Sequence, residues 1–217
     1  MNYVELKNYG KEIQGRRVLN NINLEVPQNQ IVGLLGRNAS GKTMLLRAIS
    51  GLIRPTSGTV KVRGNILTSA HPFPQSMGII IETVNFWPHY SGFSCLKILA
   101  GIKNTIDDAK IKDTLQRVGL DPDDKMPVRK YSMGMKQRLA IAQAIMEEPE
   151  LLLLDEPTNS LDTQSRGIFR NIMLEENRRG ATIIIASHIR EDLELCCKSF
   201  YCIENGEIQK EADNGMI

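Results

Sequence analysis

A short loop bounded by glycines, lying between a strand pattern and a helix pattern, constrains this chain more than any other feature. Residues 36–43 read Gly-Arg-Asn-Ala-Ser-Gly-Lys-Thr, which fits the spacing G-x-x-x-x-G-K-[ST]. The apolar run Ile31–Leu35 precedes the loop, and the helix-like run Met44–Ile49 follows it. In this order, backbone N–H groups of the loop and the helix N-terminus can converge on phosphate oxygens. The pattern predicts a phosphate-binding loop (P-loop), against the alternative of a chance glycine turn.

Within this loop, the residue types predict different roles for Lys42 and Thr43. The Lys42 ammonium can face the β- and γ-phosphates of a nucleotide, and the Thr43 hydroxyl can ligate Mg²⁺. The candidate nucleotide contacts are Gly36, Arg37, Asn38, Ala39, Ser40, Gly41, Lys42 and Thr43.

Composition narrows the class of protein. The 217 residues are 41% hydrophobic and 24% charged, with a formal net charge of only +2. These values suit one globular domain and imply no strong field for nucleic acid. No apolar run approaches the ~20 residues of a membrane span, and residues 1–5 lack the basic and apolar regions of a signal peptide. The four cysteines have no zinc-like spacing, which favours reduced thiols in a cytosolic protein.

Two kinds of strand pattern predict an α/β fold. Continuously apolar runs suit strands buried on both faces of a parallel sheet, and they occur at Ile31–Leu35, Gly78–Ile81, Leu151–Leu154 and Thr182–Ala186. Shorter alternating pieces between turn residues suit antiparallel strands, and they occur at Val4–Leu6, Val18–Leu19, Ile22–Val26 and Thr59–Val62. Near the C-terminus, Asn205-Gly206 predicts a tight hairpin between Phe200–Ile203 and Glu207–Gln209.

Helical patterns fill most of the interval between the second and third apolar runs. We expect helices over Ile106–Val118, with Thr105 as its cap, and over Leu139–Met146, and a further helix at Ser165–Arg178. Four aromatic residues, Phe86, Trp87, Tyr90 and Phe93, fall in a segment interrupted by Pro88 and Gly92, which favours a loop. These rings either pack against the core or line a groove for a partner helix.

Carboxylates and a histidine follow two of the predicted core strands. Asp155-Glu156 ends the run Leu151–Leu154, and His188 comes just after Thr182–Ala186. Ligands of open α/β sheets bind at the carboxyl ends of the strands. Asp155 can therefore hold Mg²⁺, Glu156 can orient or deprotonate an attacking water, and His188 can contact a γ-phosphate. The plainer alternatives are a carboxylate pair that leaves the core and a surface histidine.

Two further segments give this set a family resemblance. Residues 131–138 read Tyr-Ser-Met-Gly-Met-Lys-Gln-Arg, and residues 159–162 read Asn-Ser-Leu-Asp. With the P-loop, the carboxylate pair and His188 in this order, the chain resembles the ATP-binding cassette family, the nucleotide-binding subunits of ABC transporters, over nearly all of its length. There, the first segment matches the signature, usually L-S-G-G-Q, the second matches the D-loop, and His188 matches the switch histidine.

The resemblance implies an α/β P-loop NTPase (RecA-like) fold with a parallel-sheet core, an N-terminal antiparallel β subdomain and an inserted helical subdomain. Residues 1–217 form a single ATP-binding domain, in which 1–81 and 150–217 are core and 82–149 are the helical subdomain with the signature. The implied activity is ATP hydrolysis coupled to transport, with ATP and Mg²⁺ as cofactors and Glu156, His188 and Lys42 as catalytic residues.

The resemblance also implies partners. Ser132 and the backbone near Gly134 are expected to close over ATP held by a second ATP-binding subunit in a head-to-tail dimer. An integral-membrane transporter subunit is expected, with this chain cytoplasmic and peripheral on the inner face of the cell membrane, and no nucleic acid. The alternative is a soluble cassette ATPase acting in DNA maintenance or translation, but the chain lacks the long coiled-coil insertion or second cassette usual there. Retention of Lys42, Asp155, Glu156 and His188 argues against a cassette that binds ATP without hydrolysis.

Several positions depart from the usual pattern. Met133 and Met135 replace a glycine and a glutamine of the signature, and Ala39 stands where glycine is frequent. Ile13 occupies the usual place of the adenine-stacking aromatic, so either Ile13 or the nearby Tyr9 is expected to contact adenine.

At the end of the run Gly78–Ile81, Glu82 replaces the usual glutamine, and its carboxylate is a candidate third Mg²⁺ ligand. The alternative is a solvated charge at a strand end. Glu82 together with this signature resembles the branch associated with bacitracin and lantibiotic export or self-immunity. The predicted function is thus powering an exporter of a peptide antibiotic or other amphipathic compound, with the substrate, the direction of transport and the identity of the two ATPase subunits left open.

Overall fold

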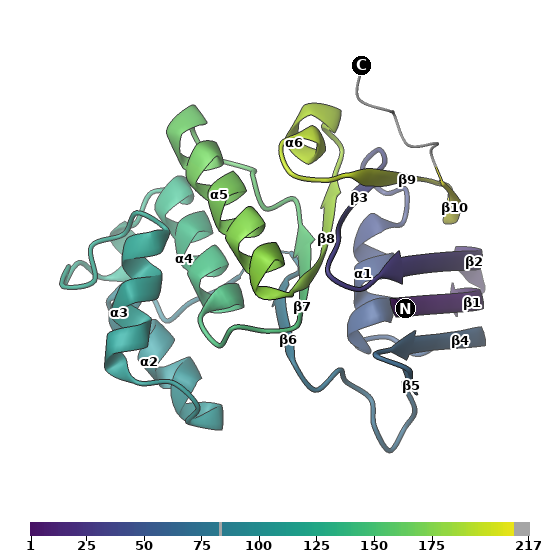
Figure 1. The fold of residues 1–217 in the computed structure, drawn as a ribbon, viewed down its shortest axis with the longest axis horizontal. Coiled ribbons are helices and arrows are strands. Elements are labelled where there is room, and N and C mark those ends of the chain that lie inside the picture. The colour runs from purple at the N-terminus through teal and green to yellow at the C-terminus, as the bar shows by residue number, and fades with distance from the viewer. Residues whose placement is uncertain (83, 211–217) are drawn as a thin grey trace.

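The computed structural model describes residues 1–82 and 84–210. Residues 83 and 211–217, which belong to the predicted ranges 82–149 and 1–217, lie outside the described residues. The architecture is α/β, with a six-stranded sheet, a four-stranded sheet and helices around them (Figure 1).

The six-stranded sheet has the order β10-β9-β3-β8-β7-β6. Its strands are β3 (Ile31–Leu35), β6 (Met77–Ile80), β7 (Leu151–Asp155), β8 (Thr182–Ser187), β9 (Ser199–Glu204) and β10 (Glu207–Lys210). All pairs are parallel except β9–β10, which is antiparallel. The four apolar runs in the sequence are therefore confirmed as neighbouring parallel strands.

Successive side chains of these strands point into two different cores, which explains why the strands are apolar throughout. On β7, Leu152 and Leu154 join a core with the helices α2, α3, α4 and α5, whereas Leu151 and Leu153 join a second core with α1 and the four-stranded sheet. The helix bounds are α1 Lys42–Ser50, α2 Gly92–Lys103, α3 Asp108–Arg117, α4 Met133–Ile145, α5 Thr163–Arg179 and α6 Arg190–Glu194, with a short 3₁₀ helix, η1, at Val128–Lys130. Because successive side chains point to opposite faces, a strand covered on both sides needs apolar residues at every position.

The four-stranded sheet is antiparallel, with the order β2-β1-β4-β5. Its strands are β1 (Asn2–Ile13), β2 (Arg16–Pro27), β4 (Ser57–Val62) and β5 (Asn65–Ile66). The two predicted pieces at 18–19 and 22–26 are parts of the single strand β2. In Figure 1, α1 lies between this sheet and the parallel strands, so the helix after the P-loop is enclosed on both sides.

The segment between β6 and β7 holds α2, α3, η1 and α4, as the helical patterns indicated. Thr105 is not a cap: α3 begins after Asp107, whose side chain accepts a hydrogen bond from the Lys110 amide. The sequence analysis also missed α2. The loop predicted around the aromatic residues ends at Ser91, the N-cap of α2, and Phe93 is helical.

The C-terminal hairpin is confirmed. Asn205 and Gly206 both have positive φ, 50° and 75°, as a tight turn between right-twisted strands requires. The carboxyl ends of β3, β7 and β8, and this turn, lie at the same edge of the six-stranded sheet, which is where the predicted functional residues gather.

Candidate active site

The loop between β3 and α1 is built to receive an anion. Gly41 is the N-cap of α1 and offers no side-chain acceptor, so the first N–H groups of the helix are left for an external partner. Lys42 is 5% exposed, and its Nζ donates to the carbonyl oxygens of Gly36 (2.7 Å) and Arg37 (3.1 Å). These bonds fold the loop around the ammonium group.

Asp155 and Thr43 lie together at the floor of this loop. The Thr43 hydroxyl donates to Asp155 Oδ2 at 2.5 Å, while Asp155 Oδ1 is buried and has no hydrogen-bond partner among the described residues. Burial, partly offset by the Thr43 hydrogen bond, raises the pKa of Asp155 above its ordinary value. A buried carboxylate oxygen without a donor, next to a hydroxyl, is a donor set that fits a small divalent cation.

The Glu156 carboxylate lies between the side chains of Lys42 and His188. It lies 3.4 Å from Lys42 Nζ, and each of its oxygens lies 3.0 Å from Nδ1 of His188. Ser187 Oγ adds a hydrogen bond at 3.3 Å. Glu156 also has a positive φ of 48°, a backbone conformation that favours glycine, so its position is held against some local strain. The structure thus brings together the three predicted catalytic residues Lys42, Glu156 and His188.

A cavity of about 570 Å³ opens over this constellation. The predicted residues in its wall include Asn38, Ala39, Lys42, Thr43 and Glu156, and sequence reasoning missed others, namely Arg16, Arg17, Val18, Asn205 and Gly206. The tight turn at 205–206 was predicted, but only as a turn. It reaches the P-loop through the Gly206 amide, which donates to the Ser40 carbonyl oxygen at 2.8 Å.

The structure decides against Tyr9 as an adenine contact. Tyr9 is fully buried in the core with the four-stranded sheet, its hydroxyl faces the Ile53 carbonyl oxygen at 3.4 Å, and burial raises its pKa to about 12. Ile13 is 40% exposed at the end of β1 but does not line the cavity; its cross-strand partner Arg16 does.

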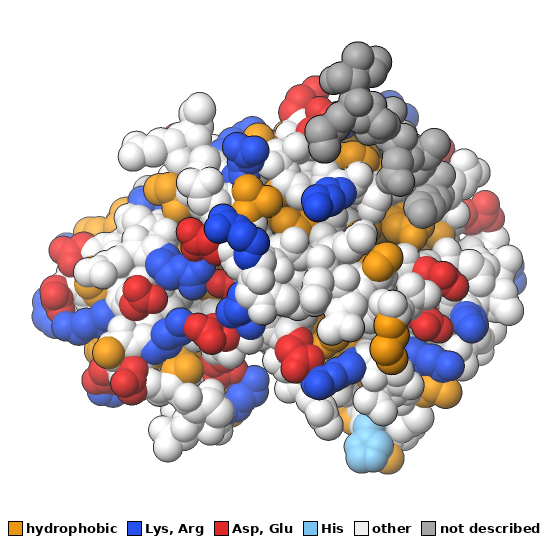
Figure 2. Space-filling view, in the orientation of Figure 1, with side chains coloured by type: hydrophobic (Ala, Val, Ile, Leu, Met, Phe, Trp, Pro, Cys, Tyr) orange, Lys and Arg blue, Asp and Glu red, His pale blue; other side chains and the backbone are white. Residues whose placement is uncertain are grey.

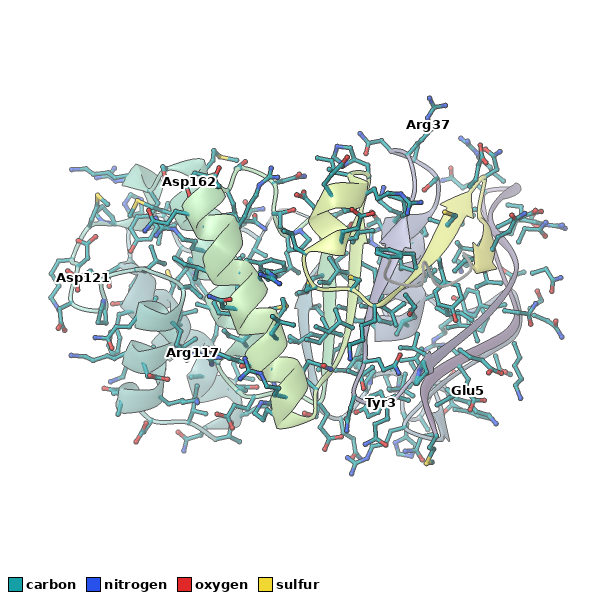
Figure 3. All side chains as sticks on the ribbon, turned by 45° about the horizontal axis from the view of Figure 1, so that its top comes forward. Tyr3, Glu5, Arg37, Arg117, Asp121 and Asp162 are labelled. Atoms are coloured by element: carbon teal, nitrogen blue, oxygen red, sulfur yellow. The ribbon has the colours of Figure 1, made fainter. Side chains whose placement is uncertain are left out.

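Arg37, another predicted contact, projects from the P-loop away from the body of the molecule in Figure 3, and it is exposed. Ala39 has a φ of 63°, so the residue that replaces a frequent glycine adopts the left-handed backbone that glycine tolerates best.

Comparisons with known proteins show which family the chain belongs to. Residues 19–159 match the family described as ABC transporter. The uncharacterized ABC transporter ATP-binding protein YybJ of Bacillus subtilis (strain 168) is 46% identical over 206 residues, which cover 95% of this chain and 94% of YybJ. The chain belongs to the ABC transporter family.

Other relatives of this ABC cassette carry more specific names. The bacitracin transport ATP-binding protein BcrA of Enterococcus faecalis is 38% identical, with coverage of 98% of this chain and 70% of BcrA. The lantibiotic transport ATP-binding protein SrtF of Streptococcus pyogenes is 34% identical, with coverage of 95% and 88%.

The fold of the cassette is also that of solved structures. An ATP-binding subunit of an ABC transporter superposes with a TM-score of 0.86 at 25% identity, covering 97% of this chain and 90% of the other. The dimeric bacterial ABC transporter cassette MJ0796 gives the same TM-score at 21% identity, covering 98% and 100%. The α/β P-loop NTPase fold expected from the sequence is confirmed.

The signature of this ABC cassette lies apart from its P-loop cavity. Ser132 is the N-cap of α4 and accepts from the Met135 amide at 3.1 Å. A Cβ on Gly134 would lie 3.0 Å from the Ser160 carbonyl oxygen, so glycine lets the D-loop pack closely on the first turn of α4. Neither Ser132 nor Gly134 is among the described residues that line the P-loop cavity. The signature and D-loop therefore form one continuous surface that lies outside the P-loop cavity.

Glu82, predicted as a metal ligand, makes its closest ion pair elsewhere. Its carboxylate lies 2.5 Å from Arg47 Nη2, its side chain is 61% exposed, and its φ is 64°. It lines a second cavity of about 890 Å³ that also reaches Asp155 and Glu156.

The aromatic segment after Glu82 divides into two pairs. Phe86 and Phe93 are partly buried against the core, which confirms the packing alternative for them. Trp87 and Tyr90 are 42% and 49% exposed. Tyr90, Ile98 and Ile102 line a shallow apolar hollow along α2.

Proposed function

We propose that this cassette binds ATP at the P-loop and hydrolyses its γ-phosphate bond, with Glu156 orienting or deprotonating the attacking water. The observation that carries this proposal is the position of the Glu156 carboxylate, 3.4 Å from the P-loop Lys42 and 3.0 Å from His188. In this proposal, Lys42 faces the β- and γ-phosphates, and His188 contacts a γ-phosphate oxygen while it holds Glu156.

The donor atoms at Thr43 and Asp155 fit Mg²⁺. Asp155 Oδ1 is buried without a hydrogen-bond partner among the described residues, and the Thr43 hydroxyl lies 2.5 Å from Oδ2 of the same carboxylate. Mg²⁺ held by Thr43 and Asp155 would supply positive charge that neutralises the phosphates of ATP. We propose Glu82 as a third ligand, direct or through water, which requires its carboxylate to leave Arg47. Ile13, exposed beside Arg16, is the residue we propose beneath adenine.

The position of the signature supports a dimer. Ser132 and Gly134 lie on the continuous signature and D-loop surface rather than on the chain's own cavity. We propose that this surface closes over the ATP of a second ATP-binding subunit in a head-to-tail pair. The dimeric state of the cassette MJ0796 supports this arrangement.

Relatives and surface features support a role in transport. The relatives named for bacitracin and lantibiotic transport suggest export of a peptide antibiotic or other amphipathic compound. Among the described residues, no helix is long and apolar enough to cross a membrane. We propose an integral-membrane partner, which would place this chain in the cytoplasm on the inner face of the cell membrane. Lys and Arg are interspersed with Asp and Glu on the face in Figure 2, and we assign no nucleic-acid role. The named relatives lend nothing to the soluble alternative.

The chemistry is tested by Glu156→Gln. Its amide cannot accept the proton of the attacking water, so turnover should fall by roughly 10²–10⁴-fold, the range for a positioned general base. ATP affinity should change little, and the variant should accumulate as an ATP-bound dimer. Steady-state ATPase rates, fluorescent ATP binding and size-exclusion chromatography give the three readouts. Turnover near the wild-type rate would remove Glu156 from this role.

Docking of the proposed membrane subunit is tested at the exposed rings of Trp87 and Tyr90. Trp87→Ala and Tyr90→Ala should weaken co-purification with the membrane subunit, because exposed Trp and Tyr are common interface anchors. Isolated ATP binding should be unchanged. Phe73→Ala, at an exposed ring of the loop between β5 and β6, is the matched control. If both ring variants assemble as well as this control does, the exposed rings of Trp87 and Tyr90 are not part of the docking site.

A further inference from the structure

Asp192 is a buried carboxylate to which the chemistry above gives no part. It lies on α6, four residues after His188, and is only 3% exposed. Both of its oxygens are satisfied by side chains. Oδ2 accepts from the Thr158 hydroxyl and Oδ1 accepts from Arg166 Nη1, each at 2.7 Å.

These two donors come from either side of the D-loop. Thr158 is fully buried two residues after Glu156, and Arg166 lies on the first turn of α5. The Nε atom of Arg166 also donates to the Leu161 carbonyl oxygen at 3.3 Å, so the same guanidinium holds the D-loop backbone. A single carboxylate therefore joins the segment after Glu156, the D-loop and the helix after His188.

The contact between Glu156 and His188 lies between two anchors. On one side, the Glu156 amide donates to the Ala186 carbonyl oxygen at 2.8 Å, and Ser187 Oγ bonds both Glu156 and the Ile189 amide. On the other side, the anchor is Asp192. His188 itself is 38% exposed, so few packing contacts fix its ring.

Asp192 lies outside the two cavities next to Glu156. It is not among the described residues that line either the P-loop cavity or the larger cavity beside it. We propose that Asp192 is a positioning residue: through Thr158 and Arg166 it holds the His188–Glu156 pair and the D-loop in one fixed relation. This inference rests on the proposed function, in which Glu156 and His188 act on the γ-phosphate and the D-loop faces the second subunit.

Substitution with asparagine probes this role with little change of shape. One amide oxygen can still accept a hydrogen bond, but the NH₂ group then faces the second donor, so either Thr158 or Arg166 loses its partner. The matched control is Glu176→Gln. Glu176 is 2% exposed on α5 and accepts from Arg117 and Arg179 at 2.8 and 2.7 Å, away from both cavities.

The test uses the full chain and two readouts. The first is the ring-proton resonance of His188 in the nucleotide-free protein. The chain holds only three histidines, so His188→Gln assigns this resonance. The second is the steady-state ATPase. In Asp192→Asn we expect the His188 resonance to move and those of His71 and His89 to stay. We also expect kcat to fall about 10-fold with KM within about twofold, since misplaced catalytic groups cost rate.

Glu176→Gln should lower the melting temperature and leave both readouts unchanged. If the His188 resonance stays in place in Asp192→Asn and kcat falls no more than in the control, Asp192 is a structural carboxylate and the proposal is overturned. Should Asp192→Asn not fold, Arg166→Gln, at a residue whose side chain is 39% exposed, decides the matter by the same readouts. If the wild-type chain has no ATPase activity, the proposed function fails, while the His188 spectrum still tests the role of Asp192.

Discussion

Two buried aspartates, Asp155 and Asp192, differ in how many hydrogen-bond donors their carboxylates have. Asp192 has a donor on each oxygen, at 2.7 Å, from Thr158 and Arg166. Asp155 has one donor, Thr43, and its other oxygen is buried without a partner among the residues described. Buried polar groups are normally satisfied, so an exception needs a reason. We infer that the satisfied carboxylate is part of the scaffold and that the unsatisfied one is completed by a ligand.

The largest expected effect that tests the difference between Asp155 and Asp192 is a loss of ATPase activity in Asp155→Asn. Asp155→Asn removes the charge that would hold Mg²⁺, and metal stabilisation of a transferring phosphoryl group is worth several kcal/mol. At ~1.4 kcal/mol per tenfold, ATPase turnover should fall by roughly 10²-fold or more. ATPase rates measured across a Mg²⁺ titration test this. Turnover within tenfold of wild type at saturating Mg²⁺ would mean that the comparison does not identify the metal ligand.

The next largest expected effect is a loss of stability in Asp192→Ala. Asp192→Ala leaves the Thr158 hydroxyl buried without an acceptor and Arg166 without its anion. Breaking a buried pair costs ~3–5 kcal/mol. We expect about 2–3 kcal/mol, because the Arg166 side chain is 39% exposed and solvent can screen it. Urea denaturation of both proteins measures the difference. Equal midpoints would show that Asp192 is not a stabilising carboxylate.

The smallest expected effect is a gain in stability in Asp155→Asn, opposite in sign to the loss expected in Asp192→Ala. Because the pKa of Asp155 is raised in the folded state, its ionisation lowers stability as pH rises through that pKa, and the loss persists at neutral pH. Without Mg²⁺ or nucleotide, Asp155→Asn should therefore melt a few degrees higher than wild type at pH 7. The gain should vanish below the ordinary Asp value of 3.8, where both side chains are neutral. Calorimetry between pH 3 and pH 8 measures this. A variant that is less stable at pH 7 would contradict the account of Asp155.

Much of the site could be predicted because it depends on local order in the chain. The strand, loop and helix around residues 31–49, and the polar residues after β7 and β8, are adjacent in sequence to the strands that position them. The satisfied contacts of Asp192 could not be predicted, since its partners Thr158 and Arg166 lie 34 and 26 residues away. The sequence left Tyr9 open as an adenine contact for a similar reason, because the core that buries it includes residues of distant strands.

Helix α2 was missed because its apolar residues are not confined to its buried face. Cys95, Leu96 and Ala100 are buried, but Ile98 and Ile102 are 41% and 78% exposed on the same helix. An apolar outer face removes the amphipathic pattern by which a surface helix is recognised. The cap of α3 was misplaced by two residues because Thr105 and Asp107 are both good capping residues, and only geometry shows that the Asp107 side chain makes the bond.

The turn at Asn205–Gly206 has a consequence for how the protein is made. β3 lies between β8 and β9, and the Gly206 amide bonds the Ser40 carbonyl oxygen of the P-loop. The ribosome thus synthesises the P-loop some 160 residues before the turn that braces it. A nascent chain that ends before β9 has a central strand with one edge unpaired and a P-loop cavity that lacks part of its wall. The P-loop cavity can therefore be complete only after residues 205 and 206 have been synthesised.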